Sequence, residues 1–450
     1  MAKLYEDQQL ASDKCMEWID RGMQGERFAG LWASAGYGKS YTVKYIIEQM
    51  MSQFDGKYMP VLCSMTHSAV DVLAEMSGMP VSTLHGLFKW VPSVDKETGE
   101  EYLSTPQMRG DTQFKSPLLP NSILVVDEGG LMGHDELALL EEELEKARAR
   151  VLFVGDHKQC YPVVKDDQEL CVPAYDVTQV MMELTIPKRV DKGDMIYALS
   201  QAMRKTVDGA RQPRLRTILN KDGSGKGVRH VDDIEEYAVK AFEAGVRDGD
   251  TTNIKVLAFT NERCVNLNRK IRKQVLGLKQ LTPVVGERMV ANSSITNSTG
   301  DEVLIKNNEQ VIVKEVEATE SHGLAGAFVQ YADLDGNDIE EIVFVPASPN
   351  KLRDRLKALS NDAQAFRANG FEEDAKDKWR SFFSLKESVA DIRYTYAMTV
   401  NKCQGVTLKH ALVDMWDINA CHDREQKARL AYTAITRATD YVTIEGELDE

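Results

Sequence analysis

The chain contains a series of short apolar segments, each of which stops abruptly at polar or glycine residues. These segments are apolar throughout rather than alternating, which is typical of strands buried on both faces of a parallel sheet. Helical periodicity follows several of them, as in Tyr41–Met51 and Asp135–Ala147. Alternation of strand and helix predicts a doubly wound α/β fold, with ligands bound where the strands end. The predicted strands are Phe28–Trp32, Pro60–Cys63, Ile123–Val126, Val151–Val154 and Val256–Phe259.

Two stretches interrupt this alternation. Residues Val94–Lys115 hold a turn signal, Asp95–Gly99, between short apolar segments and predict a small hairpin insertion. Residues Met289–Val345 show strand-like alternation, with a turn at Asp335–Asn337, and predict a small β domain. A charged helical stretch, Asn350–Val389, follows before the α/β pattern resumes. We therefore expect two insertions in a doubly wound framework.

The composition is that of an ordinary globular protein, with 43% hydrophobic and 28% charged residues in 450. Disordered, collagen-like and coiled-coil structures are therefore poor interpretations, and the length allows about three domains. No apolar run approaches the roughly 20 residues that span a bilayer, and the N-terminus lacks a signal peptide's apolar core. The seven cysteines form no Cys-x-x-Cys pair, which argues against a disulfide framework or a zinc site. We expect a reduced, cytoplasmic protein with no membrane partner.

The net charge of −15 argues against a protein that coats nucleic acid non-specifically, because such proteins are usually basic. The charge is uneven, however: eight basic residues stand between Lys255 and Arg288 against only two acidic ones. Such a run is either a solvated helix face or a locally basic groove. Both interpretations stay open at the level of the sequence.

A phosphate-binding loop follows the first predicted strand. Residues Ala33–Ser40 match the last three positions of the Gly-x-x-x-x-Gly-Lys-Ser/Thr pattern, with Ala33 in place of the first glycine. Backbone N–H groups of such a loop cradle phosphates, Lys39 adds positive charge, and the Ser40 hydroxyl is a ligand for Mg²⁺. The predicted nucleotide-binding residues here are Ala35, Gly36, Tyr37, Gly38, Lys39 and Ser40.

A carboxylate pair, Asp127-Glu128, ends the predicted strand Ile123–Val126, 88 residues after Lys39. Asp127 is expected to hold Mg²⁺, and Glu128 to orient and deprotonate the attacking water. Such a pair is weak evidence alone, but together with the phosphate loop it makes hydrolysis of ATP or GTP the leading reaction.

Three further side chains are candidates for the γ-phosphate. Gln159, in Gly155–Gln159, is placed to sense that phosphate, although the segment alone also suits a turn in which Asp156 satisfies backbone donors. Arg189 and Arg437 are candidates because guanidinium neutralises the charge that builds during hydrolysis. Any single arginine is more often a surface residue.

In their order along almost the whole chain, these segments resemble superfamily 1 helicases, on the branch that contains RecD, Pif1 and Dda. The matching segments are Glu6–Gln8, Ala33–Ser40, Ser64–Ala69, Ser82–Gly86, Val125–Glu128, Gly155–Gln159, Glu183–Thr185 with Lys188-Arg189, Ala258–Asn261, Thr399–Thr407 and Tyr432–Ala438.

The resemblance implies two RecA-like domains of the P-loop NTPase class, called 1A and 2A, with one insertion in each. Insertion 1B would be the pin that splits the duplex, and insertion 2B would contain an SH3-like β part and a charged helical part. The implied boundaries are 1–90 and 121–185 for 1A, 91–120 for 1B, 186–288 and 394–450 for 2A, and 289–393 for 2B.

The resemblance also implies residue roles. Gln8 would read adenine, and the cofactors would be ATP and Mg²⁺, the metal held by Ser40 and Asp127. The residues that would couple the γ-phosphate to domain closure are Gln159, Arg189, Gln404, beside Gly405, and Arg437. The residues expected near the DNA strand are Thr66, His67, His85, Asn261 and Thr399.

The implied activity is ATP-driven 5′-to-3′ movement on single-stranded DNA, with unwinding of forked duplex DNA. We expect a monomer, a role in replication or recombination, a single-strand-binding or replication protein as partner, and the host cytoplasm as location if the chain is viral. Three rivals stay open: a P-loop kinase or ATP-dependent switch, a nucleic-acid-binding protein with a decayed ATPase, and an RNA helicase.

Several positions depart from the family pattern or have two interpretations. The departures are Ala33, Gly129-Gly130, Cys160 and Asn401, and they bear on loop rigidity and DNA coupling rather than on hydrolysis. The aromatic residues Trp379, Phe382 and Phe383 would either contact the pin or bases, or form the core of the second insertion.

Overall fold

The computed structural model describes residues 4–95, 101–162, 168–188, 193–248, 251–278, 282–292, 295–296, 303–305, 309–339 and 342–449. The chain forms two compact units. Unit 1 contains Met1–Val91, Leu103–Val265 and Met398–Glu450, and unit 2 contains Pro92–Tyr102 and Asn266–Ala397.

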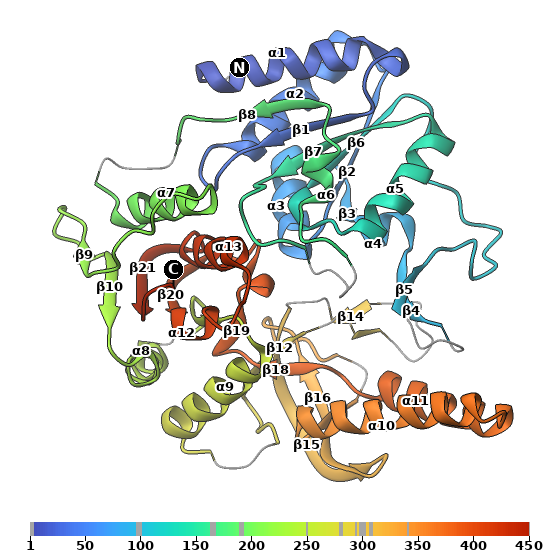
Figure 1. Cartoon of the computed structure of the whole chain (residues 1–450), viewed down its shortest axis with the longest axis vertical. Helices are drawn as coiled ribbons and strands as arrows, with labels where there is room; N and C mark the ends of the chain where they lie inside the picture. The colour runs from blue at the N-terminus through green and yellow to red at the C-terminus, as the bar shows by residue number, and fades with distance from the viewer. Residues whose placement is uncertain are drawn as a thin grey trace. The chain divides into compact units, whose positions relative to one another are not determined.

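The first sheet of unit 1 is parallel at every pairing between its described strands (Figure 1). Its order is β3-β2-β6-β7-β1-β8. Parallel neighbours cannot be joined by a tight hairpin, so the connections between these strands are crossovers, several of which contain helices. The strands are β1 (Phe28–Trp32), β2 (Met59–Ser64), β3 (Val81–Thr83), β6 (Ser122–Asp127), β7 (Arg150–Gly155) and β8 (Val180–Glu183).

Helices cover both faces of this sheet, which confirms the predicted doubly wound fold. Ile123 and Val125 face one hydrophobic cluster, with α1, α2 and α3, and the alternate residues Leu124 and Val126 face another, with α4, α5 and α6. Burial on both faces is the reason that these strands appear as unbroken apolar runs. The bounds are α1 (Glu6–Asp20), α2 (Lys39–Gln53), α3 (His67–Ser77), α4 (Leu84–Phe88), α5 (His134–Ala147), α6 (Pro173–Asp176), η1 (Gly22–Gln24) and η2 (Gly129–Leu131).

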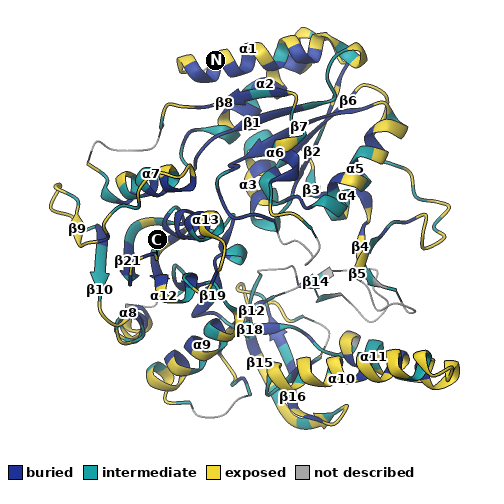
Figure 2. Cartoon of the chain, in the orientation of Figure 1, coloured by how far each residue is buried: buried dark blue, intermediate teal, exposed yellow. Residues whose placement is uncertain are grey.

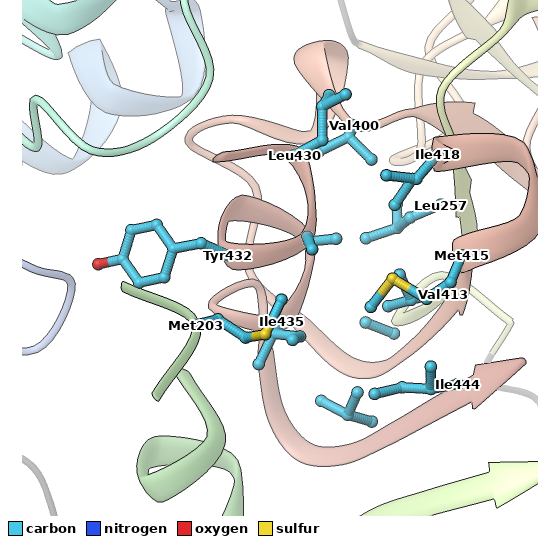
Figure 3. Packing of buried hydrophobic residues seen from close by; sticks show 14 of the residues in the cluster. Met203, Leu257, Val400, Val413, Met415, Ile418, Leu430, Tyr432, Ile435 and Ile444 are labelled. Atoms are coloured by element: carbon cyan, nitrogen blue, oxygen red, sulfur yellow. The ribbon is translucent and has the colours of Figure 1, made fainter. Parts of the chain in front are cut away.

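The second sheet has the order β19-β11-β20-β21-β10-β9, in which the central strands are parallel and β9 is antiparallel. Helices α7 and α13 pack together over a core that contains Leu257, Val413 and Ile444 (Figure 3). Helix α8 packs against β11, β20 and β21. The elements are α7 (Met195–Val207), β9 (Ile218–Leu219), β10 (Gly227–Val231), α8 (Ile234–Asp248), β11 (Ile254–Ala258), α9 (Asn261–Leu276), β19 (Ala397–Thr399), η3 (Asn401–Cys403), β20 (Leu408–Asp414), α12 (Met415–Ile418), α13 (Arg424–Ile435) and β21 (Ala438–Glu445).

Unit 2 is built on an antiparallel sheet of order β17-β16-β15-β12-β18, which confirms the predicted β-rich insertion. The charged helical stretch forms two helices, because the chain turns at Gly370, which has φ +81°. The outer faces of these helices are exposed (Figure 2). Part of the predicted strand at Glu341 lies outside the described residues. The elements are β12 (Arg288–Ala291), β13 (Ile295–Thr296), β14 (Val303–Ile305), β15 (Gln310–Ser321), β16 (Leu324–Ala332), β17 (Val343–Pro346), α10 (Pro349–Ala368), α11 (Glu372–Ser388) and β18 (Ile392–Tyr394).

The predicted hairpin insertion forms a two-stranded ribbon of β4 (Val91–Val94) and β5 (Glu101–Ser104). Most of its predicted turn, residues 96–100, lies outside the described residues. The ribbon ends earlier than the predicted Lys115. Arg109 then fastens the following turn by donating to the backbone oxygens of Ser104 and Lys89, both at 2.6 Å.

The aromatic group of α11 belongs to the insertion's own packing. Trp379 is only 5% exposed, and its ring lies 5.4 Å from that of Phe382 and 6.0 Å from that of Phe383. Of the two interpretations of this group, the structure favours the core.

The basic stretch between Lys255 and Arg288 is not a simple solvated face. Within unit 1, Arg263 pairs with Asp414 at 2.7 Å and also with Glu235, and Lys255 is buried. Within unit 2, the buried Arg272 pairs with Glu287 at 2.6 Å. Several of these cations therefore have structural partners. Among the described residues, no helix combines the length and the apolar character needed to cross a membrane.

Candidate nucleotide site

The phosphate loop joins the end of β1 to the start of α2. Gly36 and Gly38 adopt φ angles of +82° and +83°, which favour glycine. Lys39, the first residue of α2, donates from Nζ to the backbone oxygens of Ala33 at 2.9 Å and Ser34 at 3.3 Å. The loop thus brings an ammonium group and a helix N-terminus together, and this arrangement suits phosphate.

Ala33 fits the loop without strain. Its φ is not in the left-handed region, its side chain is buried in the first-sheet core, and its N–H donates to the Gly155 oxygen at 2.9 Å. A glycine is therefore not required at this position, and the departure from the family pattern leaves the loop ordered.

The predicted carboxylate pair stands at the end of β6. Burial and the neighbouring Glu128 charge raise the pKa of Asp127 to about 7, against the opposing effects of the Glu128 N–H, at 2.9 Å, and of Lys39. Glu128 has a φ of +52°, which is uncommon for a residue with a side chain and is found at functional sites. Two neighbouring carboxylates are a donor set suited to a divalent cation. Ser40, partly buried in the first turn of α2, is the predicted hydroxyl ligand.

Gly129 and Gly130 follow the pair because the chain passes close to the end of β7. A Cβ at Gly130 would lie 3.3 Å from the Asp156 oxygen, and one at Gly155 would lie 3.2 Å from the Gly130 nitrogen. Close backbone packing therefore accounts for this departure.

The segment after β7 makes buried contacts with the second sheet's helices. Asp156, 4% exposed, accepts from Arg204 of α7 at 2.5 Å and from the Tyr432 hydroxyl of α13 at 2.7 Å. Burial alone would raise the pKa of Asp156, but the Arg204 charge, supported by Lys39 and Tyr432, lowers it. Asp156 is thus an ionised bridge between the two halves of unit 1, rather than only a turn residue.

The same segment is held to α13 by its backbone. The Cys160 N–H donates to the Thr433 hydroxyl at 3.0 Å, and the Gln159 oxygen accepts from Arg429 at 3.1 Å. Cys160 is buried in the core cluster of the second sheet, where a thiol acts as a small apolar group. Gln159 itself is 5% exposed.

Two buried side chains of the second half carry polar atoms without hydrogen-bond partners among the described residues. Arg437, 7% exposed, donates from Nη2 to the Thr436 hydroxyl at 3.1 Å, whereas its Nε has no partner there. Gln404, 4% exposed and next to Gly405, has an unpartnered Oε1. A buried polar group without a hydrogen bond lowers the stability of the fold, and a hydrogen bond to a polar ligand would remove that penalty. These residues therefore fit a phosphate-bearing ligand.

The predicted adenine reader lies against the phosphate loop. Gln8 donates from Nε2 to the Gly38 oxygen at 3.5 Å, and a Cβ at Gly38 would lie 2.7 Å from that nitrogen. Its neighbour Asp7 accepts from the Thr185 N–H at 2.9 Å and from Lys188 Nζ at 2.7 Å. Although burial opposes it, the Lys188 contact and backbone donors lower the pKa of Asp7. The sequence motifs contain Asp7 and Lys188 but predict no role for either, and their separation of 181 residues hides the pairing.

The residues predicted to contact DNA lie on several different elements. Thr66 caps α3 and lies close to Gly405, where an added Cβ would be 3.1 Å from the Thr66 hydroxyl. His85, in α4, lies 3.7 Å from Glu136. The remaining three are His67 at the start of α3, Asn261 exposed at the start of α9, and Thr399, which is only 7% exposed at the end of β19.

One predicted residue, Arg189, lies outside the described residues. Sequence reasoning missed Arg204 and Tyr432 as partners of Asp156. Tyr432 stands within a family motif, but α7, which carries Arg204, contains no family segment that would have drawn attention to it.

Comparison with known proteins agrees with this architecture. Residues 16–211 match an AAA domain family, and residues 394–444 match the UvrD-like helicase C-terminal domain. The ATP-dependent DNA helicase dda of Enterobacteria phage T4 is 23% identical over 431 residues, covering 90% of this chain and 91% of that protein. An uncharacterized protein of Acanthamoeba polyphaga mimivirus is 19% identical, covering 96% of this chain and 98% of that protein.

A solved structure described as the basis for DNA unwinding at forked double-stranded DNA by two coordinating Pif1 helicases has a TM-score of 0.50 at 14% identity. It covers 98% of this chain and 92% of that one, and it supports the fold. The two sheets and the phosphate-loop site define a P-loop NTPase with two RecA-like domains. Within that class, the chain is similar to the Pif1/Dda-like helicases of superfamily 1B.

Proposed function

We propose that the chain is an ATP-dependent DNA helicase that moves 5′ to 3′ on single-stranded DNA and separates forked duplex DNA. The observation that carries this proposal is the buried Arg437 of the second RecA-like domain, whose guanidinium Nε has no partner among the described residues. A nucleotide switch needs only one such domain, whereas an arginine from a second domain suits a motor that closes on its nucleotide.

The first domain supplies the residues for hydrolysis. Lys39 would leave its loop carbonyls to contact the β- and γ-phosphates, and Gln8 would contact the adenine. Ser40 and Asp127 would hold Mg²⁺, which supplies positive charge to the phosphate oxygens. Glu128 would accept a proton from the attacking water, whose oxygen bonds to the γ-phosphorus as the bond to ADP breaks.

The second domain would supply the closing contacts. Arg437 neutralises charge on the γ-phosphate in the transition state and Gln404 senses its presence, while Gln159, which follows β7 of the first domain, senses it as well. Arg189 is proposed for the same task. Because these contacts exist only with triphosphate, hydrolysis would weaken the closed state and release the grip on DNA.

The DNA path is assigned by resemblance. Thr66, His67, His85, Asn261 and Thr399 are proposed to lie along the strand, with the β4–β5 ribbon as the 1B pin and unit 2 holding an SH3-like 2B domain. Contacts to the phosphate backbone would make binding tolerant of sequence. We propose a monomeric motor for replication or recombination, with a single-strand-binding or replication protein as partner.

Steady-state ATP hydrolysis, measured with and without single-stranded DNA, tests the activity. We expect strong stimulation by DNA and a loss of at least about 100-fold in Lys39→Ala, because its charge acts on the transition state. Lys44→Ala is the matched control, since Lys44 is a lysine of the same helix with a loose ion pair to Glu48 at 4.0 Å. Hydrolysis indifferent to DNA would favour a nucleotide switch.

Strand displacement on matched partial duplexes tests direction and substrate. Duplexes with only a 5′ single-stranded tail should be unwound, and duplexes with only a 3′ tail should not. Replacing the tail by RNA separates a DNA helicase from an RNA helicase, because only RNA offers the 2′-hydroxyl. Preference for the 3′ tail would contradict the proposed direction of movement and would leave the proposed ATP hydrolysis unaffected.

A further inference from the structure

Helix α7 of the second domain contacts the first domain through three side chains on one face. They stand at positions 197, 201 and 204, a spacing that aligns residues along a helix. The Tyr37 hydroxyl lies 2.9 Å from the Tyr197 hydroxyl and donates to Gln201 Oε1 at 3.3 Å, so Tyr197 donates to Tyr37. One turn further, Arg204 donates to Asp156 at 2.5 Å.

Tyr37 belongs to the phosphate loop itself. It stands between Gly36 and Gly38, both in the left-handed region, and two residues before Lys39. Its side chain is 7% exposed and packs in the core of the first sheet. Its hydroxyl therefore follows any movement of the loop backbone, and it carries that movement to the second domain.

The other side of α7 is fastened to the helix that leads to Arg437. Met203 of α7 packs in one cluster with Ile435 of α13, and Figure 3 shows the Tyr432 hydroxyl pointing away from that cluster. That hydroxyl lies 3.2 Å from the Arg204 guanidinium and donates to Asp156 at 2.7 Å. A displacement of α7 must therefore shift α13, since both apolar and charged contacts join the two helices.

The phosphate loop has a reason to change when nucleotide binds. Lys39 donates to the Ala33 and Ser34 oxygens, both in the loop that contains Tyr37. Phosphates would draw Lys39 away from these carbonyls and occupy the loop N–H groups. The loop therefore has different contacts with and without nucleotide, as a transmitted signal requires.

We propose that Tyr37 is a positioning residue, whose hydroxyl transmits the state of the phosphate loop through α7 to α13 and thereby places Arg437. This inference rests on the proposed ATPase. Tyr37 does not contact the reacting atoms through its side chain in this scheme; it acts through Tyr197 and Gln201. The relay gives α7 a function, although no recognised motif lies on it.

Tyr37→Phe removes the hydroxyl and keeps the buried ring. Tyr58→Phe is the matched control, because Tyr58 packs in the same core and its hydroxyl has no hydrogen-bond partner among the described residues. We expect kcat in the presence of DNA to fall about five- to tenfold in Tyr37→Phe with KM for ATP nearly unchanged, since backbone groups bind the phosphates. Tyr58→Phe should match the wild type.

A double-variant cycle separates a relay from independent structural damage. Tyr197→Phe should lower kcat by no more than Tyr37→Phe does, because the bond from Tyr37 to Gln201 remains. Adding Tyr197→Phe to Tyr37→Phe should change little, because the bond between the two hydroxyls is already lost. Effects that multiply, or a Tyr37→Phe enzyme within twofold of wild type, would overturn the relay.

Hydrogen exchange supplies a readout that needs neither hydrolysis nor DNA. A non-hydrolysable ATP analogue should slow exchange of α13 amides in the wild type and in Tyr58→Phe but not in Tyr37→Phe. Equal protection in all three proteins would contradict the relay. A wild type that hydrolyses ATP without DNA stimulation would instead refute the helicase proposal, and the exchange comparison would still test Tyr37.

Discussion

At the scale of single residues, the site depends on a few positions where the backbone conformation or the side-chain contacts restrict which amino acid can stand there. Gly38 combines a φ of +83° with a space filled by Gln8. Asp156 is a buried carboxylate that is stable only because Arg204 and Tyr432 both donate to it. Substitutions at these two positions should therefore have separable consequences.

Gly38→Ala should reduce both stability and ATP affinity. The left-handed backbone costs an L-residue about 1 kcal/mol, and the new Cβ would displace Gln8 from the loop. Gly78→Ala carries the backbone cost alone, because Gly78 has a φ of +67° and no atom within 4 Å of its Cβ position. Urea unfolding should show similar losses in both variants, whereas only Gly38→Ala should raise KM for ATP. Equal KM values would mean that Gln8 does not help to bind nucleotide.

Asp156→Asn should lower the free energy of unfolding by about 3 kcal/mol at pH 7, since the Arg204 charge would stay buried without its counterion. The pKa of Asp156 is lowered in the folded chain from the usual 3.8, so its contribution is present above about pH 4 and is lost as the pH falls further. The gap between wild type and variant should therefore close in acid. An exposed control, Asp13→Asn in α1, should change stability little at any pH, and a gap that widens in acid would refute the assignment.

At the scale of elements, the strands were predictable because parallel strands buried on both faces leave unbroken apolar runs in the sequence. The division between α10 and α11 at Gly370 and the early end of the ribbon at Ser104 were not, because neighbouring polar residues suit helix, turn and strand end alike. The phosphate loop and Asp127-Glu128 could be recognised because each motif is local. The hydrogen bond from Tyr432 to Asp156 joins residues that are 276 positions apart, and no local sequence pattern predicts such a pairing.

The second insertion should depend on its aromatic packing. Trp379→Ala should destabilise unit 2 by about 3 to 5 kcal/mol, since the buried indole has Phe382 and Phe383 as neighbours. Phe371→Ala, 56% exposed before the same helix, should cost much less. Thermal unfolding measures both, and DNA affinity at a temperature where the variant is folded should be unchanged. A selective loss of DNA binding would restore the interpretation of Trp379 as a base contact.

At the scale of the whole molecule, an acidic chain must hold a polyanion through local charges. The net charge is −15, and Arg263 and Arg272 already pair with carboxylates. We expect few phosphates to be neutralised, so the logarithm of affinity for a labelled deoxythymidine oligomer should fall with the logarithm of salt concentration with a slope of about −2 to −3. Fluorescence anisotropy across a sodium chloride series measures this slope. A slope of about −7 would reveal a continuous basic groove.

The contacts that hold both ends of α1 have a consequence for the order of events in each cycle of ATP hydrolysis. Arg150 donates to the Trp18 and Ile19 oxygens at one end of the helix, and Asp7 is held by Thr185 and Lys188 at the other. These four contacts all lie within unit 1 and involve no strand or helix of the second sheet, so Gln8 has a support that does not depend on those elements. The base would then be selected while the two RecA-like domains are open. A nucleotide with an unsuitable base could dissociate before the domains close on it.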